Sequence, residues 1–123
     1  MPAGNKEFGD KIRALREAKK VKDPSFSLRQ FASAAGISAT FLSKVETGEF
    51  PPPAAETIKR IAELLEVNAD ELLALAGKVD PDLPEIIREK PKALADFLRT
   101  AQEHGLTEKD FEKLTDKIKK GKI

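Results

Sequence analysis

The sequence predicts an all-α fold, and three observations support this prediction. Apolar residues recur at intervals of three and four along most of the chain, which is the spacing of one face of a helix. Capping side chains precede several of these stretches, and no segment has a convincing strand pattern. The length of 123 residues fits one compact core, or one small domain with an appendage.

The expected helices are defined by their apolar stripes and by their starts. The first carries an apolar stripe of Phe8, Ile12, Leu15 and Val21. Four later helices have the same local start, in which apolar residues lie directly before the capping residue and four positions after it. The four expected caps are Ser27, Ser38, Asn68 and Thr107. Gln30 and Glu71 follow two of these caps by three residues, which predicts reciprocal capping boxes there.

Proline and glycine indicate where the domains divide. Residues 51–53 are three prolines, which cannot lie inside a helix because proline lacks the amide donor. Gly77 is expected to end a short leucine-rich helix, and residues 78–84, with three charges and two prolines, are expected to be a linker. The predicted domains are therefore 1–77 and 85–123. The second is expected to contain a helical region that breaks at Pro91, and then a last helix.

Composition excludes several classes of function. No apolar run approaches the roughly 18 residues of a membrane helix, and the first residues lack a secretory signal, so we expect a cytoplasmic protein. With no cysteine and a single histidine, the chain cannot assemble a thiolate or histidine-rich zinc site, and we expect no metal or cofactor. That histidine, His104, is expected to end a helix. We therefore do not expect an enzyme.

Charge is distributed unevenly, although the net charge is only +1. Residues 1–60 carry 11 basic and 7 acidic side chains, residues 61–90 carry 3 and 8, and residues 91–123 carry 8 and 6. The N-terminal half is thus weakly basic, which is compatible with contact to phosphates but does not by itself indicate it.

The segment 27–48 has the pattern of two short helices joined by a tight turn. Ala32 is small where the second helix must cross the first, and Gly36 can adopt the left-handed conformation that ends a helix. Ile37, Leu42 and Val45 are expected to bury the inner face of the second helix. The residues left facing outward are small, polar or basic, namely Ser38, Ala39, Thr40, Ser43 and Lys44. Such a strip fits a DNA major groove about 12 Å wide.

This segment resembles the helix-turn-helix of the phage-repressor and Cro type, the XRE family. The residues that carry the resemblance are Ser27 to Phe31, Ala32, Gly36, Ile37, Ser38, Leu42, Ser43 and Glu46 to Gly48. The resemblance covers about residues 8–76 and implies a five-helix, lambda-repressor-like bundle in which the helix that begins at Ser38 reads DNA.

The resemblance also implies roles for single residues. Ala39, Thr40, Ser43 and Lys44 would contact base edges, while the amides near Ser27 and the loop 47–49 would face phosphates. The residues expected to bind DNA are Ser27, Arg29, Gln30, Ser38, Ala39, Thr40, Ser43, Lys44, Thr47 and Gly48.

Two departures from the family pattern affect the expected phosphate contacts. Leu28 stands where many members have a glutamine that grips phosphate, and we expect Arg29 to replace that contact. Glu49 and the three prolines stand where several members have basic residues. We therefore expect a small phosphate footprint and an affinity that depends on dimerisation.

The expected function is that of a sequence-specific regulator of transcription that binds duplex DNA as a repressor. Two amphipathic helices in the C-terminal segment would expose more apolar surface than they can bury alone, which favours a homodimer and a palindromic operator. The residues expected to form the dimer are Phe97, Leu98, Phe111, Leu114 and Ile118.

Other interpretations remain open. A short domain of this type with a helical tail also resembles repressors that a partner metallopeptidase cleaves, and antitoxins that pair with a toxin share the same DNA-binding domain. From another class of function, the same bundle could serve as an adaptor that binds protein and not DNA. The polar residues Ser38, Thr40, Ser43 and Lys44 argue against the adaptor.

Overall fold

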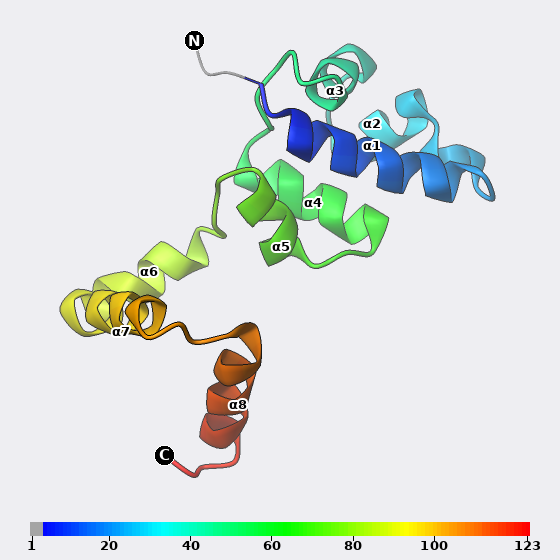
Figure 1. The fold of residues 1–123 in the computed structure, drawn as a ribbon. Coiled ribbons are helices and arrows are strands. Elements are labelled where there is room, and N and C mark those ends of the chain that lie inside the picture. Colours follow the sequence, from blue (N-terminus) through cyan, green and yellow to red (C-terminus); the bar gives the residue numbers. More distant parts are fainter. Residues whose placement is uncertain (1–3) are drawn as a thin grey trace. The chain divides into compact units, whose positions relative to one another are not determined.

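The computed structural model describes residues 4–123, and every regular element in that range is helical (Figure 1). The predicted all-α fold is therefore confirmed. The described residues up to Pro81 form one compact unit, and Asp82–Ile123 form a second. The first unit contains, in order, α1 (Lys6–Lys20), the 3-10 helix η1 (Pro24–Phe26), α2 (Leu28–Ala35), α3 (Ala39–Glu46), α4 (Ala55–Leu65) and α5 (Ala69–Leu75).

The core of the N-terminal unit is built from α1 to α5: α1 contacts η1, α3, α4 and α5, while α2 packs on α3 and α4 (Figure 1). The largest side chains with no or almost no exposed surface are Phe8, Ile12, Phe31, Leu42, Val45, Ile58, Ile61, Leu65 and Leu73. Val21 does not belong to this core, because 82% of it is exposed. Val21 follows Ile12 by nine residues, about two and a half helical turns, and so lies on the opposite face of α1.

Local capping explains where the helices begin. Oxygen atoms of Ser27, Ser38, Asn68 and Thr107 accept hydrogen bonds from the amides three residues later, at 3.0 to 3.3 Å. These four bonds confirm the predicted starts.

The predicted capping boxes differ from those in the structure. The reciprocal bond, from a cap amide back to the side chain three residues on, is recorded at Thr107 and Asp110, at 2.9 Å. The boxes expected from Gln30 and Glu71 are not formed: both side chains are exposed, and bending back would remove their rotamer freedom. The short Asp110 side chain has less such freedom to lose.

The C-terminal unit consists of α6 (Asp82–Glu89), α7 (Pro91–Glu103) and α8 (Glu108–Lys119). The expected break at Pro91 is present, and this proline is the first residue of α7. An amide at this position has no intrahelical acceptor, so the helix loses no hydrogen bond by having proline there. The expected linker was too long, because α6 begins at Asp82, inside the range 78–84. Pro84 lies in the first turn of α6, a position that tolerates proline.

The second unit has almost no buried core among its residues. Ala101 is its one buried side chain, with 5% exposed. Several of its larger apolar side chains are exposed, with values of 51% for Ile86, 48% for Phe97, 51% for Leu98 and 63% for Ile118. Within the described range, none of the helices has the length and apolar character needed to cross a lipid bilayer.

Candidate nucleic-acid interface

Helices α2 and α3 meet at a tight turn centred on Gly36. Its φ angle of 78° is left-handed, a conformation that glycine adopts without a steric penalty. The amides of Gly36 and Ile37 donate to the carbonyls of Ser33 and Ala32, at 3.1 and 3.0 Å, and so close the end of α2. Ala32 is fully buried, which lets the two helices approach closely. The geometry predicted for this turn is confirmed.

The two faces of α3 differ sharply in character. Leu42 and Val45 are buried at 0% and 1% exposure, whereas Ile37, in the preceding turn, is only partly buried. On the outer face Ser38 and Thr40 are exposed, and the half-buried residues there are Ala39, Ser43 and Lys44. The sequence-predicted strip thus lies together on one accessible side of α3, from its N-cap to its last turn.

The start of α2 presents a second group of predicted residues. Arg29 and Gln30 are exposed, while Ser27 is half-buried and caps the helix. No ion pair of Arg29 is recorded within residues 4–123, so its guanidinium is available to an outside anion. Leu28 is half-buried and packs against the core. A polar residue at this position would lose that apolar contact.

The loop after α3 folds back onto the helix that precedes it. The carbonyl of Lys44 accepts from the amides of Glu49 and Phe50, at 2.9 and 3.1 Å, and from the Thr47 hydroxyl at 3.2 Å. That hydroxyl also lies 2.9 Å from the Glu49 carboxylate. Thr47 is exposed. Its hydroxyl has one donor hydrogen, for which the Lys44 carbonyl and the Glu49 carboxylate are both within hydrogen-bond distance. Gly48 has a left-handed φ of 82°.

A buried ion pair ties α3 to α1. The Arg16 Nε and Nη2 atoms donate to the two carboxylate oxygens of Glu46, at 2.8 and 2.9 Å, and each residue is only 3% exposed. Nη1 of Arg16 donates to the carbonyl of Phe26 at 3.0 Å. The hydrogen bond to Glu46 raises the pKa of Arg16 above its ordinary value. The guanidinium thus holds three segments of the unit together.

The helix-turn-helix pattern does not predict this pair, although a signal for it is present in the sequence. Arg16 follows Ile12 by four residues and Glu46 follows Leu42 by four, so each charge lies on the apolar stripe of its own helix. A charge at such a position requires a buried partner of opposite sign. The sequence could have predicted a pair in this way.

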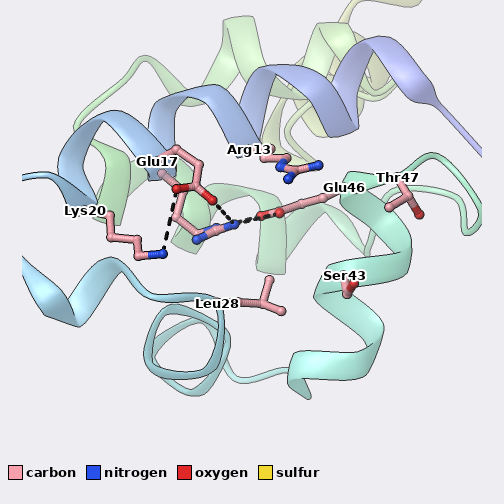
Figure 2. Close-up of a pocket in the computed structure, with 8 residues that line it drawn as sticks. Arg13, Glu17, Lys20, Leu28, Ser43, Glu46 and Thr47 are labelled. Carbon is pink, nitrogen blue, oxygen red and sulfur yellow. Dashed lines mark hydrogen bonds and ion pairs between the residues drawn. The ribbon is translucent and has the colours of Figure 1, made fainter.

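A pocket of about 360 Å³ opens beside this ion pair (Figure 2). It lies between α1, the start of α2 and the outer side of α3. The lining residues are Arg13, Arg16, Glu17, Lys20, Leu28, Ser43, Glu46 and Thr47. Glu17 pairs with both Arg16 and Lys20, at 3.3 and 3.9 Å. Arg13 is exposed and takes part in none of these ion pairs. Within residues 4–123 it therefore adds an unpaired positive charge to the pocket, and it is not among the residues expected from the sequence to bind DNA.

Comparison with known proteins assigns the N-terminal unit to a family. The family model for a helix-turn-helix domain matches residues 7–75, more than half of the chain, and the protein belongs to this family.

Among curated relatives, an uncharacterized HTH-type transcriptional regulator of Bacillus subtilis (strain 168), RghRB, is 39% identical over 82 residues, covering 67% of this chain and 55% of RghRB. The HTH-type transcriptional repressor RghR of the same organism is 36% identical over 73 residues, covering 59% of this chain and 50% of RghR. The chain thus spans about half the length of these relatives. Their names describe regulators of transcription, in agreement with the expectation that the chain is not an enzyme.

A solved structure of a complex between the SinR and SinI proteins also matches. The match covers 94% of this chain and 97% of that chain, with a TM-score of 0.47 and 22% sequence identity.

Proposed function

We propose that the protein is a transcriptional regulator, acting as a repressor, that binds duplex DNA with α3 in the major groove. The observation that carries this proposal is the accessible strip of small, polar and basic side chains on α3, directly opposite a fully buried apolar face. A helix of this kind can enter the groove without bulky obstruction. The membership of the protein in the helix-turn-helix family supports the same function.

In this proposal base edges are read by Ala39, Thr40, Ser43 and Lys44. The Lys44 ammonium suits the O6 and N7 acceptors of guanine, and the methyl groups of Ala39 and Thr40 suit the methyl group of thymine. Ser38 fixes the start of α3 through its bond to the amide of Phe41. The buried pair of Arg16 and Glu46 holds the other end of α3, so the strip is presented by a rigid element.

Phosphates are expected to approach the start of α2 and the adjoining pocket. The first amides of α2 have no intrahelical acceptor and carry the positive end of the helix dipole. Arg29 lies in this first turn, and Arg13 adds an unpaired charge on the α1 side of the pocket. These groups supply affinity without reading sequence.

Substitutions of Arg29 and Lys44 are expected to have different effects on DNA binding. Arg29→Ala removes a phosphate contact, so it should weaken binding to every duplex and reduce the dependence of affinity on salt by about one unit of slope. Lys44→Ala removes a base contact, so it should relax preference at one base pair by about 1 to 3 kcal/mol. Fluorescence anisotropy with a duplex enriched from a random library, and with a scrambled duplex, measures both effects.

A matched control is Arg99→Ala in the C-terminal unit, which removes the same charge from an exposed site and should leave both affinities unchanged. Full retention of binding and salt dependence in both Arg29→Ala and Lys44→Ala would contradict the proposed interface. Absence of any salt-sensitive DNA complex of the unmodified protein would favour the adaptor interpretation.

We further propose that the protein binds its operator as a homodimer formed by the C-terminal unit. The support is the set of apolar side chains that this unit leaves accessible. Phe97, Leu98 and Ile118 are exposed, and Phe111 and Leu114 are half-buried. A patch of this kind on a small unit is typical of a protein interface. A two-fold dimer would present two copies of α3 to successive major grooves, which requires a palindromic operator.

Sedimentation at micromolar concentration is expected to give twice the chain mass of 13.5 kDa. The double substitution of Phe97 and Leu98 by aspartate should halve that mass, because two charges would be buried in the apolar interface. Val21→Asp, at an exposed apolar residue of the N-terminal unit, should leave the mass unchanged. A monomeric mass for the unmodified protein would overturn the dimer proposal.

A further inference from the structure

We propose that Phe50 is a positioning residue for Lys44, and that its ring determines how well α3 discriminates between base sequences. This inference rests on the proposed DNA-binding function and adds a residue that the helix-turn-helix pattern leaves without a role. Phe50 lies outside α3, four residues after it ends, and 39% of its surface is exposed.

The ring of Phe50 contacts two side chains of α3. The Lys44 Nζ atom lies 5.0 Å from the ring centroid, within the range of a cation–π interaction. The second contact is with Phe41: the two ring centroids lie 6.0 Å apart, and the ring planes are tilted by 47° to each other. Phe41 and Lys44 are three residues apart and therefore neighbours on one face of the helix. Phe50 covers that face.

The backbone fixes the ring with respect to Lys44. The amide of Phe50 donates to the carbonyl of Lys44 itself, at 3.1 Å. Pro51 follows and restricts the backbone of Phe50 to extended conformations. The residue that supplies the ring is thus hydrogen-bonded through its backbone to the residue whose ammonium it contacts, which keeps the two side chains close to each other.

No acidic group competes with the ring for the ammonium. Among residues 4–123, no ion pair of Lys44 is recorded. The two nearest carboxylates in sequence have other partners: that of Glu46 pairs with Arg16 at 2.8 Å, and that of Glu49 accepts from the Thr47 hydroxyl at 2.9 Å. The contact with the Phe50 ring is therefore the one that positions the Lys44 ammonium among the described residues.

This arrangement matters because a free lysine is poorly suited to reading bases. Its ammonium sits at the end of four rotatable bonds, and binding must freeze the rotamers of this flexible stem. A ring that holds the ammonium before binding removes part of that loss, which is preorganisation. The stabilisation expected for an exposed cation–π contact corresponds to about a two- to fivefold change in affinity.

The first test uses the free protein, so it does not depend on DNA binding. The ε-methylene protons of Lys44 should show an upfield ring-current shift in the proton NMR spectrum. Phe50→Leu keeps an apolar side chain but removes the ring, and should return these resonances to ordinary values. Phe50→Tyr keeps the ring and should preserve the shift. An unshifted resonance in the unmodified protein would overturn the proposal.

The second test is a double-mutant cycle with duplexes enriched from a random library and a scrambled duplex. Phe50→Leu should reduce the preference for the enriched duplex about two- to fivefold, and should have no such effect in a Lys44→Ala background. A loss that is equal in both backgrounds would show a general effect of Phe50 on folding or binding, and would overturn the proposal. Absence of salt-sensitive binding by the unmodified protein would instead count against the proposed function alone, because the NMR result stands apart from it.

Discussion

Replacing Glu46 by alanine is expected to lower the free energy of unfolding by about 3 to 5 kcal/mol, because it removes the buried, bidentate counter-charge of the Arg16 guanidinium. Both side chains are only 3% exposed, so the guanidinium loses its main partner at a position with little contact to solvent. The remaining partners of Arg16 are the Phe26 carbonyl and the more exposed Glu17. Urea denaturation followed by circular dichroism measures the change.

Two further variants test the reason for this loss. Lys6 and Asp10 also form an ion pair, with an N–O distance of 3.3 Å, but their side chains are 75% and 58% exposed. Asp10→Ala should therefore change stability by about 0.5 kcal/mol or less. The double replacement Arg16→Met with Glu46→Leu should recover most of the stability lost in Glu46→Ala, because no unpaired charge remains. A loss in Glu46→Ala no larger than in Asp10→Ala would contradict the structural role of the pair.

The second large effect is expected at Gly9, where α1 passes the end of α3. A Cβ atom built on Gly9 would overlap the carbonyl oxygen of Val45 and would lie 2.7 Å from that of Glu46. These are backbone atoms and cannot rotate away, so the two helices must move apart. Gly9→Ala is expected to destabilise the protein by about 3 kcal/mol, the upper end for overpacking, even though alanine favours a helix over glycine by about 1 kcal/mol.

The matched control for Gly9→Ala is Ala14→Leu, which adds apolar atoms to an exposed position of the same helix. Its stability should stay within about 0.5 kcal/mol of the original. Thermal and urea unfolding compare the two variants. An unchanged or increased stability in Gly9→Ala would show that α1 and α3 do not approach as closely as the structure indicates.

Helix starts and the α2–α3 turn could be predicted from the sequence because their causes are local. The cap at Ser38 needs only the amide of Phe41, and the turn at Gly36 needs only a residue that tolerates a left-handed backbone. The outer strip of α3 followed from the helical period once the inner residues had been identified.

Features that depend on distant parts of the chain could not be predicted in the same way. The pair of Arg16 and Glu46 joins residues 30 positions apart, and sequence spacing does not state which buried charge meets which. From the sequence alone, Gly9 is a residue that disfavours the helix it lies in. Its role is evident only from the structure, where the carbonyls at the end of α3 lie against it. The contact between Lys44 and Phe50 depends on the loop folding back, which the prolines after it did not reveal.

The central claim is that DNA is bound by the start of α2 and the outer side of α3. The most direct test is a titration of the isotope-labelled protein with a short duplex at low salt, followed by amide chemical shifts. Sequence-independent phosphate contact is sufficient for this measurement, so no operator needs to be known. We predict shift changes at residues 27–30 and 38–48 that weaken as salt is added. Changes confined to α5 or to Asp82–Ile123, or no change at all, would contradict the claim.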